Sequence, residues 1–100
     1  MKLNLKDRLL IQGILPAEGN FTTLVIKSDL LEKVKVTQEE ITELEIETKD
    51  NVVKWNLEKD IEKEFDLTEL ELNLIKDSLK KLDDGGKLND DTFILYKKLK

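Results

Sequence analysis

The stretch TELELNLIKDSLKKL, residues 68–82, gives the clearest indication of how this chain folds. Thr68 and Glu71 form a capping box, in which each side chain accepts a hydrogen bond from the other residue's backbone N–H. Apolar residues then recur at helical spacing, at Leu70, Leu74, Ile75, Leu79 and Leu82. The stretch therefore predicts an amphipathic helix with one apolar stripe. Gly85 and Gly86 end it, because glycine readily takes the left-handed cap conformation.

Weaker signals predict four further helices. Asn4 caps a helix of about residues 4–15 that Pro16 ends, and Asn89 caps a last helix over residues 90–99. Thr37 and Glu40 form a second capping box, which starts a short helix through residue 44. In the short helix we expect Ile41 and Leu44 to face inward. In the last helix Phe93, Tyr96 and Leu99 recur every three residues.

The segment 21–34 allows two interpretations at its start. Residues 21–27 are rich in β-branched and aromatic residues and could form a strand. However, Phe21, Leu24, Val25, Leu31 and Val34 lie on one helical face, without polar–apolar alternation. We therefore favour a helix.

The period changes in the middle of the chain. Residues 45–49 and 52–56 flank Asp50-Asn51 and predict a β-hairpin, and alternation over 61–67 suggests a third strand. Trp55 shares a face with Val53, so we expect it to cover the core, the alternative being an exposed interface anchor. The predicted fold is a single α+β domain over residues 1–100, mostly helical. It has about five helices and a two- to three-stranded antiparallel sheet between helices three and four.

Composition excludes several kinds of chemistry. The chain has no Cys and no His, so it lacks thiolate ligands, cysteine nucleophiles and the usual general base. No apolar stretch approaches the ~20 residues that span a bilayer, and the N-terminal stretch resembles an amphipathic helix more than a signal peptide. We expect a cytoplasmic protein without a membrane partner.

The net charge of −5 is unevenly distributed. Residues 1–44 carry six basic and seven acidic side chains, and residues 45–100 carry eleven and fifteen. Nucleic-acid binders normally present a basic face, so nucleic acid is not an expected partner. An acidic surface suits a basic protein partner.

The Asp-rich turn is the one candidate metal site. Asp83, Asp84, Asp90 and Asp91 surround two glycines and superficially resemble the end of an EF-hand loop. Aligned on Gly86, the first, fifth and twelfth ligand positions hold Lys81, Gly85 and Thr92. We therefore predict no metal and no cofactor, with the four aspartates as weak Ca²⁺ candidates.

A winged-helix DNA-binding domain is an alternative interpretation. Two helices, a short turn, a third helix and a hairpin are its ingredients. The third helix would have to read DNA, yet it carries Glu39, Glu40 and Glu43 and no basic residue. These three glutamates and Trp55 are better candidates for contact with a protein.

The N-terminal stretch LLIQGILPAEGNF, residues 9–21, resembles small uncharacterised proteins of phages and prophages of Gram-positive bacteria. The later Trp and the closing pattern Lys87-Leu88 with Leu95-Tyr96-Lys97 are similar too. The resemblance implies a phage-encoded accessory protein but assigns chemistry to no residue.

Together these observations predict a non-enzymatic protein-interaction module, a phage accessory or regulatory protein, and not an enzyme. The alternatives are a winged-helix-like DNA-binding regulator and a self-associating structural component, and the second of these would form a homo-oligomer.

Overall fold

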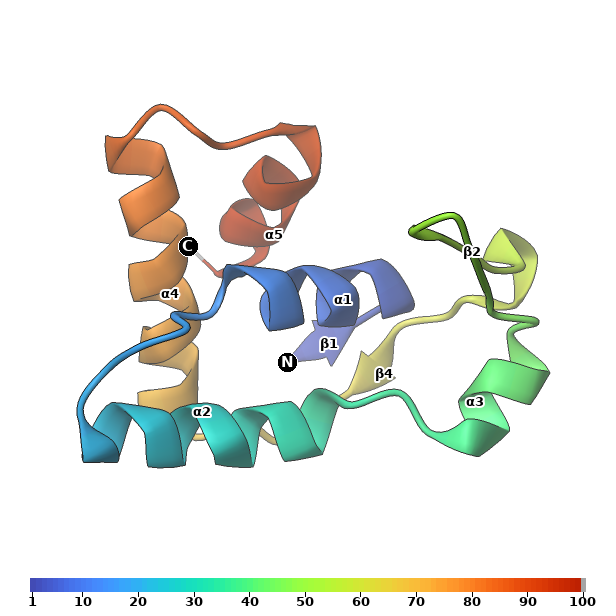
Figure 1. The fold of residues 1–100 in the computed structure, drawn as a ribbon, viewed down its shortest axis with the longest axis horizontal. Coiled ribbons are helices and arrows are strands. Elements are labelled where there is room, and N and C mark those ends of the chain that lie inside the picture. Colours follow the sequence, from blue (N-terminus) through green and yellow to red (C-terminus); the bar gives the residue numbers. More distant parts are fainter. Residues whose placement is uncertain (100) are drawn as a thin grey trace.

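The computed structural model describes residues 1–99 and is mostly helical, with two small antiparallel strand pairs (Figure 1). The described residues form five α-helices: α1 (Leu5–Ile14), α2 (Phe21–Val34), α3 (Gln38–Glu43), α4 (Glu69–Asp84) and α5 (Asp90–Leu99). The short elements are β1 (Lys2–Leu3), β2 (Glu47–Lys49), β3 (Val52–Lys54), β4 (Lys63–Glu64) and the 3₁₀ helix η1 (Leu57–Lys59). The predicted α+β class, with a sheet between α3 and α4, is confirmed.

The predicted hairpin is present, and its turn has the expected chemistry. β2 pairs with β3, with Thr48 opposite Val53. Asp50 and Asn51 have φ angles of 52° and 64°, the positive values that a two-residue type I′ turn requires at both positions. Polar residues that tolerate this conformation therefore fix the register of the hairpin.

The third strand exists, but it does not extend the hairpin. β4 pairs with β1, with Leu3 opposite Lys63. The Phe65 N–H donates to the Met1 carbonyl at 2.9 Å and continues the pairing. Alternation along residues 61–67 indicates an extended segment, but it contains no information on a partner about sixty residues away.

Residues 21–27 form the first part of α2, as favoured. The Asn20 side chain accepts from the Thr23 N–H at 2.8 Å and starts the helix. Phe21 is 84% exposed, so it lacks the packing against neighbouring side chains that usually stabilises an aromatic residue in a strand. The local cap, rather than β propensity, determines the structure here.

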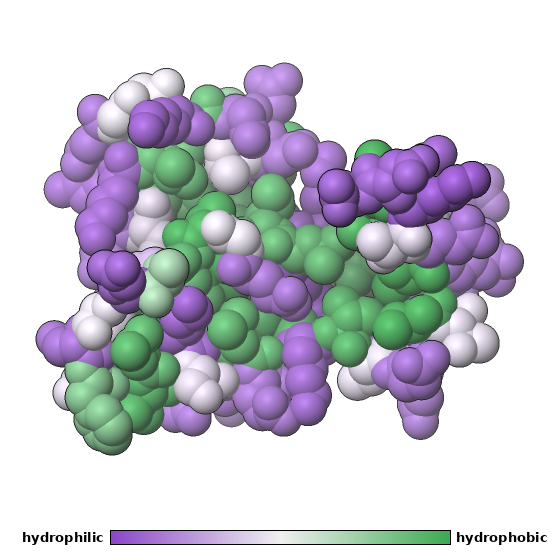
Figure 2. Space-filling view, viewed as in Figure 1, coloured by the Kyte–Doolittle hydropathy of each residue, from purple (hydrophilic) through white to green (hydrophobic). Residues whose placement is uncertain are grey.

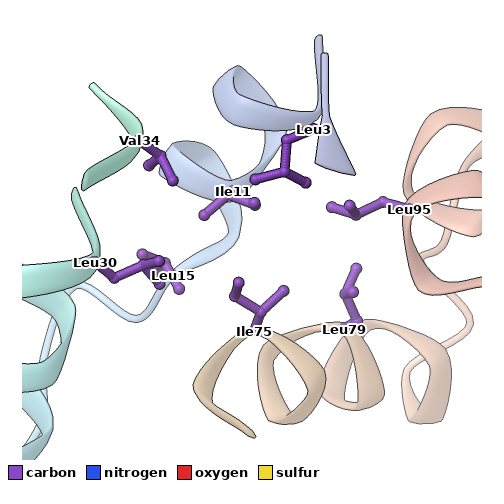
Figure 3. Packing of buried hydrophobic residues seen from close by; sticks show 8 residues of the cluster. All are labelled: Leu3, Ile11, Leu15, Leu30, Val34, Ile75, Leu79 and Leu95. Carbon is purple, nitrogen blue, oxygen red and sulfur yellow. The ribbon is translucent and has the colours of Figure 1, made fainter. Parts of the chain in front are cut away.

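One apolar core lies between the helices, and Figure 3 shows how its side chains converge from α1, α2, α4, α5 and β1. The cluster consists of Leu3, Ile11, Leu15, Leu30, Val34, Ile75, Leu79 and Leu95. α4 is central to it, since it packs against α1, α2 and α5. We call these helices with the β1–β4 pair, residues 1–36 and 61–99, the helical body.

Some predicted inward positions face solvent. Leu70 and Phe93 are 61% and 52% exposed, and Ile41 is also exposed, whereas Leu95 is fully buried. Phe93, Tyr96 and Leu99 recur every three residues, and that spacing drifts around a helix with 3.6 residues per turn. α5 therefore buries Thr92 and Leu95, and Tyr96 and Leu99 are partly buried against the same core.

Residues 37–60 project from one side of the helical body (Figure 1), and we call them the arm. The arm contains α3, the β2–β3 hairpin and η1. Trp55 follows the end of β3 and is half-buried. We expected it to cover the core, but it does not belong to the apolar core cluster. Its indole N–H donates instead to Asp60 Oδ2 at 3.2 Å, within the arm.

Candidate functional site: the groove between the helical body and the arm

Arg8 of α1 connects the arm to the helical body. Its side chain is almost completely buried, and its guanidinium donates to the backbone carbonyls of Val34 at 3.0 Å and Lys35 at 2.5 Å. It also forms a two-pronged contact with the Glu40 carboxylate, with Nη2 at 2.9 Å from Oε1 and Nη1 bonded to Oε2. One buried cation thus fixes both the end of α2 and the start of α3.

Other groups complete the environment of this ion pair. Lys63 Nζ donates to Glu40 Oε2 at 3.1 Å, and the Arg8 guanidinium lies 5.0 Å from the centroid of the Phe65 ring. The Arg8 hydrogen bond is the main cause that lowers the pKa of Glu40 far below its ordinary value. Glu40 is therefore ionised at neutral pH and is committed to an internal contact.

This arrangement recurs at three helix starts. The third helical residue of α1, α3 and α4 is a capping-box acid, namely Asp7, Glu40 and Glu71. Each of these buried carboxylates also binds a cation from another element, in the pairs Asp7–Lys98, Glu40–Arg8 and Glu71–Lys33. The caps that start the helices thus also hold the elements together.

The pKa values agree with this role. Burial alone would raise the pKa of Glu71, but hydrogen bonds from Lys33 and Thr68 leave it lowered. Burial would lower the pKa of Lys98, but its bonds to Asp7 and Glu62 leave it raised. The Lys98 hydrogen bond lowers the pKa of Glu62. All four shifted groups favour their charged forms.

A second polar contact holds the far end of the arm. The Leu5 N–H, at the start of α1, donates to Asp60 Oδ1 at 2.9 Å, while Trp55 donates to the other oxygen. Within the arm, the Asn56 N–H donates to the Leu44 carbonyl at 2.8 Å. Asp60 and Arg8 therefore fix the arm at two points along α1.

The arm carries the whole net charge of the chain. Residues 37–60 hold eight acidic and three basic side chains, whereas the other residues hold fourteen of each. The sequence halves gave only a coarse picture of this asymmetry. In the structure the charge asymmetry falls between two regions, an acidic arm and a nearly neutral helical body.

An apolar groove of about 580 Å³ lies at the junction of the two regions. In Figure 2, apolar side chains gather in the hollow between α1, α2 and the arm. The groove is lined by Leu5, Leu9, Gln12, Lys27, Leu31, Lys35, Val36, Ile41, Ile46, Thr48 and Val53. Its lining contains two lysines and no carboxylate.

A second hollow of about 410 Å³ adjoins the groove along α2. It shares Lys27, Leu31 and Lys35 with the groove and continues to Leu24. The exposed Phe21 and Val25 lie in the same first two turns of α2 as Leu24. The apolar surface therefore extends along much of this helix.

The predicted interface residues lie at different places in the arm. Glu39 and Glu43 are exposed on α3, while Glu40 is buried against Arg8 and has no free carboxylate to offer a partner. Trp55 is half-buried and bonded to Asp60. None of these four side chains lines the groove, which sequence reasoning did not identify.

The Asp-rich turn forms no metal cage in the part of the chain that is described. Asp83 and Asp84 end α4 and are exposed, and Gly86 adopts the expected left-handed conformation with φ 65°. Asp91 forms an ion pair with Lys6 at 2.7 Å. Within residues 1–99, no three Asp or Glu side chains gather closely enough to hold a metal ion.

Comparison with known proteins gives no relative: no family model, no curated protein and no solved structure matches this chain. The likeness to phage proteins stays a prediction. Among residues 1–99, no helix combines the length and the apolar composition needed to cross a membrane.

A signal for the Arg8 contact was present in the sequence. Arg8 lies three residues from both Leu5 and Ile11, and both are buried on the inner face of α1. A single cation on an apolar helical face requires a partner, because an unpaired buried charge is costly. Which of the twenty-two acids supplies that partner depends on the tertiary fold.

Proposed function

We propose that this chain is a non-enzymatic protein-interaction module that binds a partner in the groove between the helical body and the arm. One observation carries the proposal: apolar side chains from α1, α2, α3 and the hairpin converge on an open hollow. Burying apolar surface is favourable by about 25 cal/mol per Å². An exposed apolar patch is therefore a common site of protein contact.

The carboxyls with shifted pKa values are unsuited to acid–base catalysis. A carboxyl that acts as a general acid near neutral pH needs a raised pKa. Glu40, Glu62 and Glu71 have lowered pKa values instead, and each is bonded to a cation. These groups serve as structural ion pairs.

The distribution of charge supports a protein partner over DNA. In a winged-helix domain α3 would approach the phosphate backbone, yet Glu39 and Glu43 are exposed on it. The arm that contains α3 has eight acidic and three basic side chains, so its net charge equals the net charge of −5 of the whole chain. Such a field repels nucleic acid. A phage accessory or regulatory factor that acts on a host or phage protein fits the resemblance of the N-terminal stretch.

Site-specific photo-cross-linking tests the proposal. A photoreactive residue replaces Val53 in the groove, and in the matched control it replaces Leu57, which is exposed on the same arm but does not line the groove. In lysate of a Gram-positive host, we expect one protein to cross-link at Val53 and not at Leu57, and an excess of unlabelled chain to compete.

The captured protein is then purified and tested for direct binding to wild-type chain and to Leu9→Asp, which places a charge in the groove. Loss of binding in Leu9→Asp supports the groove. Equal capture from both positions, or capture from neither, contradicts the proposal. Cross-linking between two copies of the chain would favour the self-associating alternative.

A further inference from the structure

We infer that the groove accepts an amphipathic helix of the partner whose apolar stripe is flanked by acidic residues. The inference rests on the proposed function and specifies the chemistry of the partner segment. The charge that we infer for the partner segment is opposite to the positive charge that the net charge of the chain suggests. The reason is that the side chains that line the groove differ in charge from the rest of the surface.

The shape of the apolar surface indicates an elongated occupant. The two hollows adjoin along α2 and share three lining residues. Leu24 and Leu31, which line the second hollow, are seven residues apart, or about 10.5 Å along a helix that rises about 1.5 Å per residue. A helix that places apolar residues at positions i, i+3, i+4 and i+7 presents a stripe of this length.

The charged side chains around the hollows are predominantly cationic. Lys27 and Lys35 line both hollows, and Glu32 is the one carboxylate residue, present only in the second hollow. Glu32 already forms an ion pair with Lys35 at 2.6 Å. Lys27 donates to the Pro16 carbonyl at 2.8 Å and forms no ion pair within residues 1–99. A carboxylate beside the apolar stripe would complement this lysine.

The acidic arm does not reverse this preference at close range. Glu39 and Glu43 border hollows on other sides of α3, and neither lines the groove. A charge in contact with the bound segment acts on it more strongly than a charge outside the lining, because the Coulomb energy falls with distance and salt screens it further. Contact with Lys27 and Lys35 therefore determines which flanking charge the groove accepts.

Three synthetic helical peptides test the inference. They share a leucine stripe at i, i+3, i+4 and i+7 and differ only in the flanking residues, which are Glu, Gln or Lys. At physiological ionic strength we expect the Glu peptide to bind about tenfold more tightly than the Lys peptide, since two lysines change from attraction to repulsion. Backbone amide NMR shifts should concentrate at Leu9, Leu31, Ile41 and Val53.

Charge reversal in the chain supplies the matched control. Lys27→Glu with Lys35→Glu should reverse the order of the peptides. Lys76→Glu with Lys80→Glu changes the net charge equally on the exposed surface of α4 and should leave the order unchanged. Circular dichroism confirms that both double variants are folded before binding is compared.

Two results would overturn the inference. The Lys peptide could bind in the groove as tightly as the Glu peptide, which refutes the acidic flank but leaves protein binding in the groove intact. Alternatively, none of the three peptides could shift the groove amides, which refutes the helical occupant. In that case the cross-linking experiment decides separately whether the groove binds protein at all.

Discussion

The helical body and the arm are held in place by different interactions. In the body, eight apolar side chains from five elements form one buried cluster. In the arm, Leu44 is the one buried apolar side chain within residues 37–60, and it does not belong to that cluster. The arm depends instead on Arg8, Glu40 and Asp60, through hydrogen bonds and an ion pair.

The backbone shows the same contrast. The three non-glycine residues with positive φ among residues 1–99 are Glu45, Asp50 and Asn51, and all lie in the arm. Such conformations cost energy that the surrounding contacts must compensate. The arm is thus the more polar and more strained region, and it supplies one wall of the groove. Its attachment to the body therefore determines the shape of the groove.

The largest effect should follow from breaking the body. Leu79→Ala removes most of a fully buried side chain and should lower the free energy of unfolding by about 2–5 kcal/mol. Urea unfolding followed by far-ultraviolet circular dichroism measures this change. Phe93→Ala, at an exposed position of α5, should cost much less. Equal losses in the two variants would contradict the assignment of the core.

A smaller and more local effect should follow from breaking the arm. Glu40→Gln weakens the contact with Arg8, and removing one partner of a buried ion pair costs about 3–5 kcal/mol if the other stays buried. If the arm detaches, water reaches Arg8 and its charge is no longer buried. The loss of stability therefore cannot exceed the free energy that holds the arm on the helical body.

Trp55, the only tryptophan in the chain, lies in the arm and can report this detachment. In Glu40→Gln, its fluorescence should change at a lower urea concentration than the helical circular dichroism signal. Glu39→Gln, an exposed neighbour, is the control and should leave the two signals as in the wild type. Transitions that coincide in Glu40→Gln would contradict the separation of the two regions.

Acid should weaken the arm in the same way. The folded-state pKa of Glu40 lies below its ordinary value of 4.5, so the ion pair stabilises the fold above pH 4.5, and this stability is lost as the pH falls. Trp55 fluorescence should therefore change as the pH falls below 4.5. Glu40→Gln should reduce this pH dependence, whereas an unchanged acid profile in this variant would show that Glu40 is not the responsible group.

The smallest effect on stability should come from the groove surface. Val53→Thr keeps the shape of an exposed side chain and should change stability by about 0.5 kcal/mol or less. The same change should weaken binding of the Glu peptide, because it adds a hydroxyl to the apolar lining. Leu57→Thr, outside the groove, should leave binding unchanged. If both variants bind the Glu peptide equally well, Val53 is not part of the interface.

The elements that could be predicted from the sequence have short-range causes. Thr37 and Thr68 lie three residues from the glutamates that complete their caps, and Asp50-Asn51 forms the hairpin turn directly. The β1–β4 pairing and the Arg8–Glu40 contact join residues that are far apart in the chain. No periodicity specifies such partners. The groove lies between four segments and appears only when they are assembled.

Native-state hydrogen exchange of the wild-type chain tests the central difference between arm and body most directly. We expect the amides of the β2–β3 hairpin to exchange through a local opening, with a low free energy and a weak dependence on denaturant. Core amides of α4 around Ile75 and Leu79 should exchange only through global unfolding. If hairpin and core amides share one free energy and one denaturant dependence, the two regions form a single cooperative unit and the account is wrong.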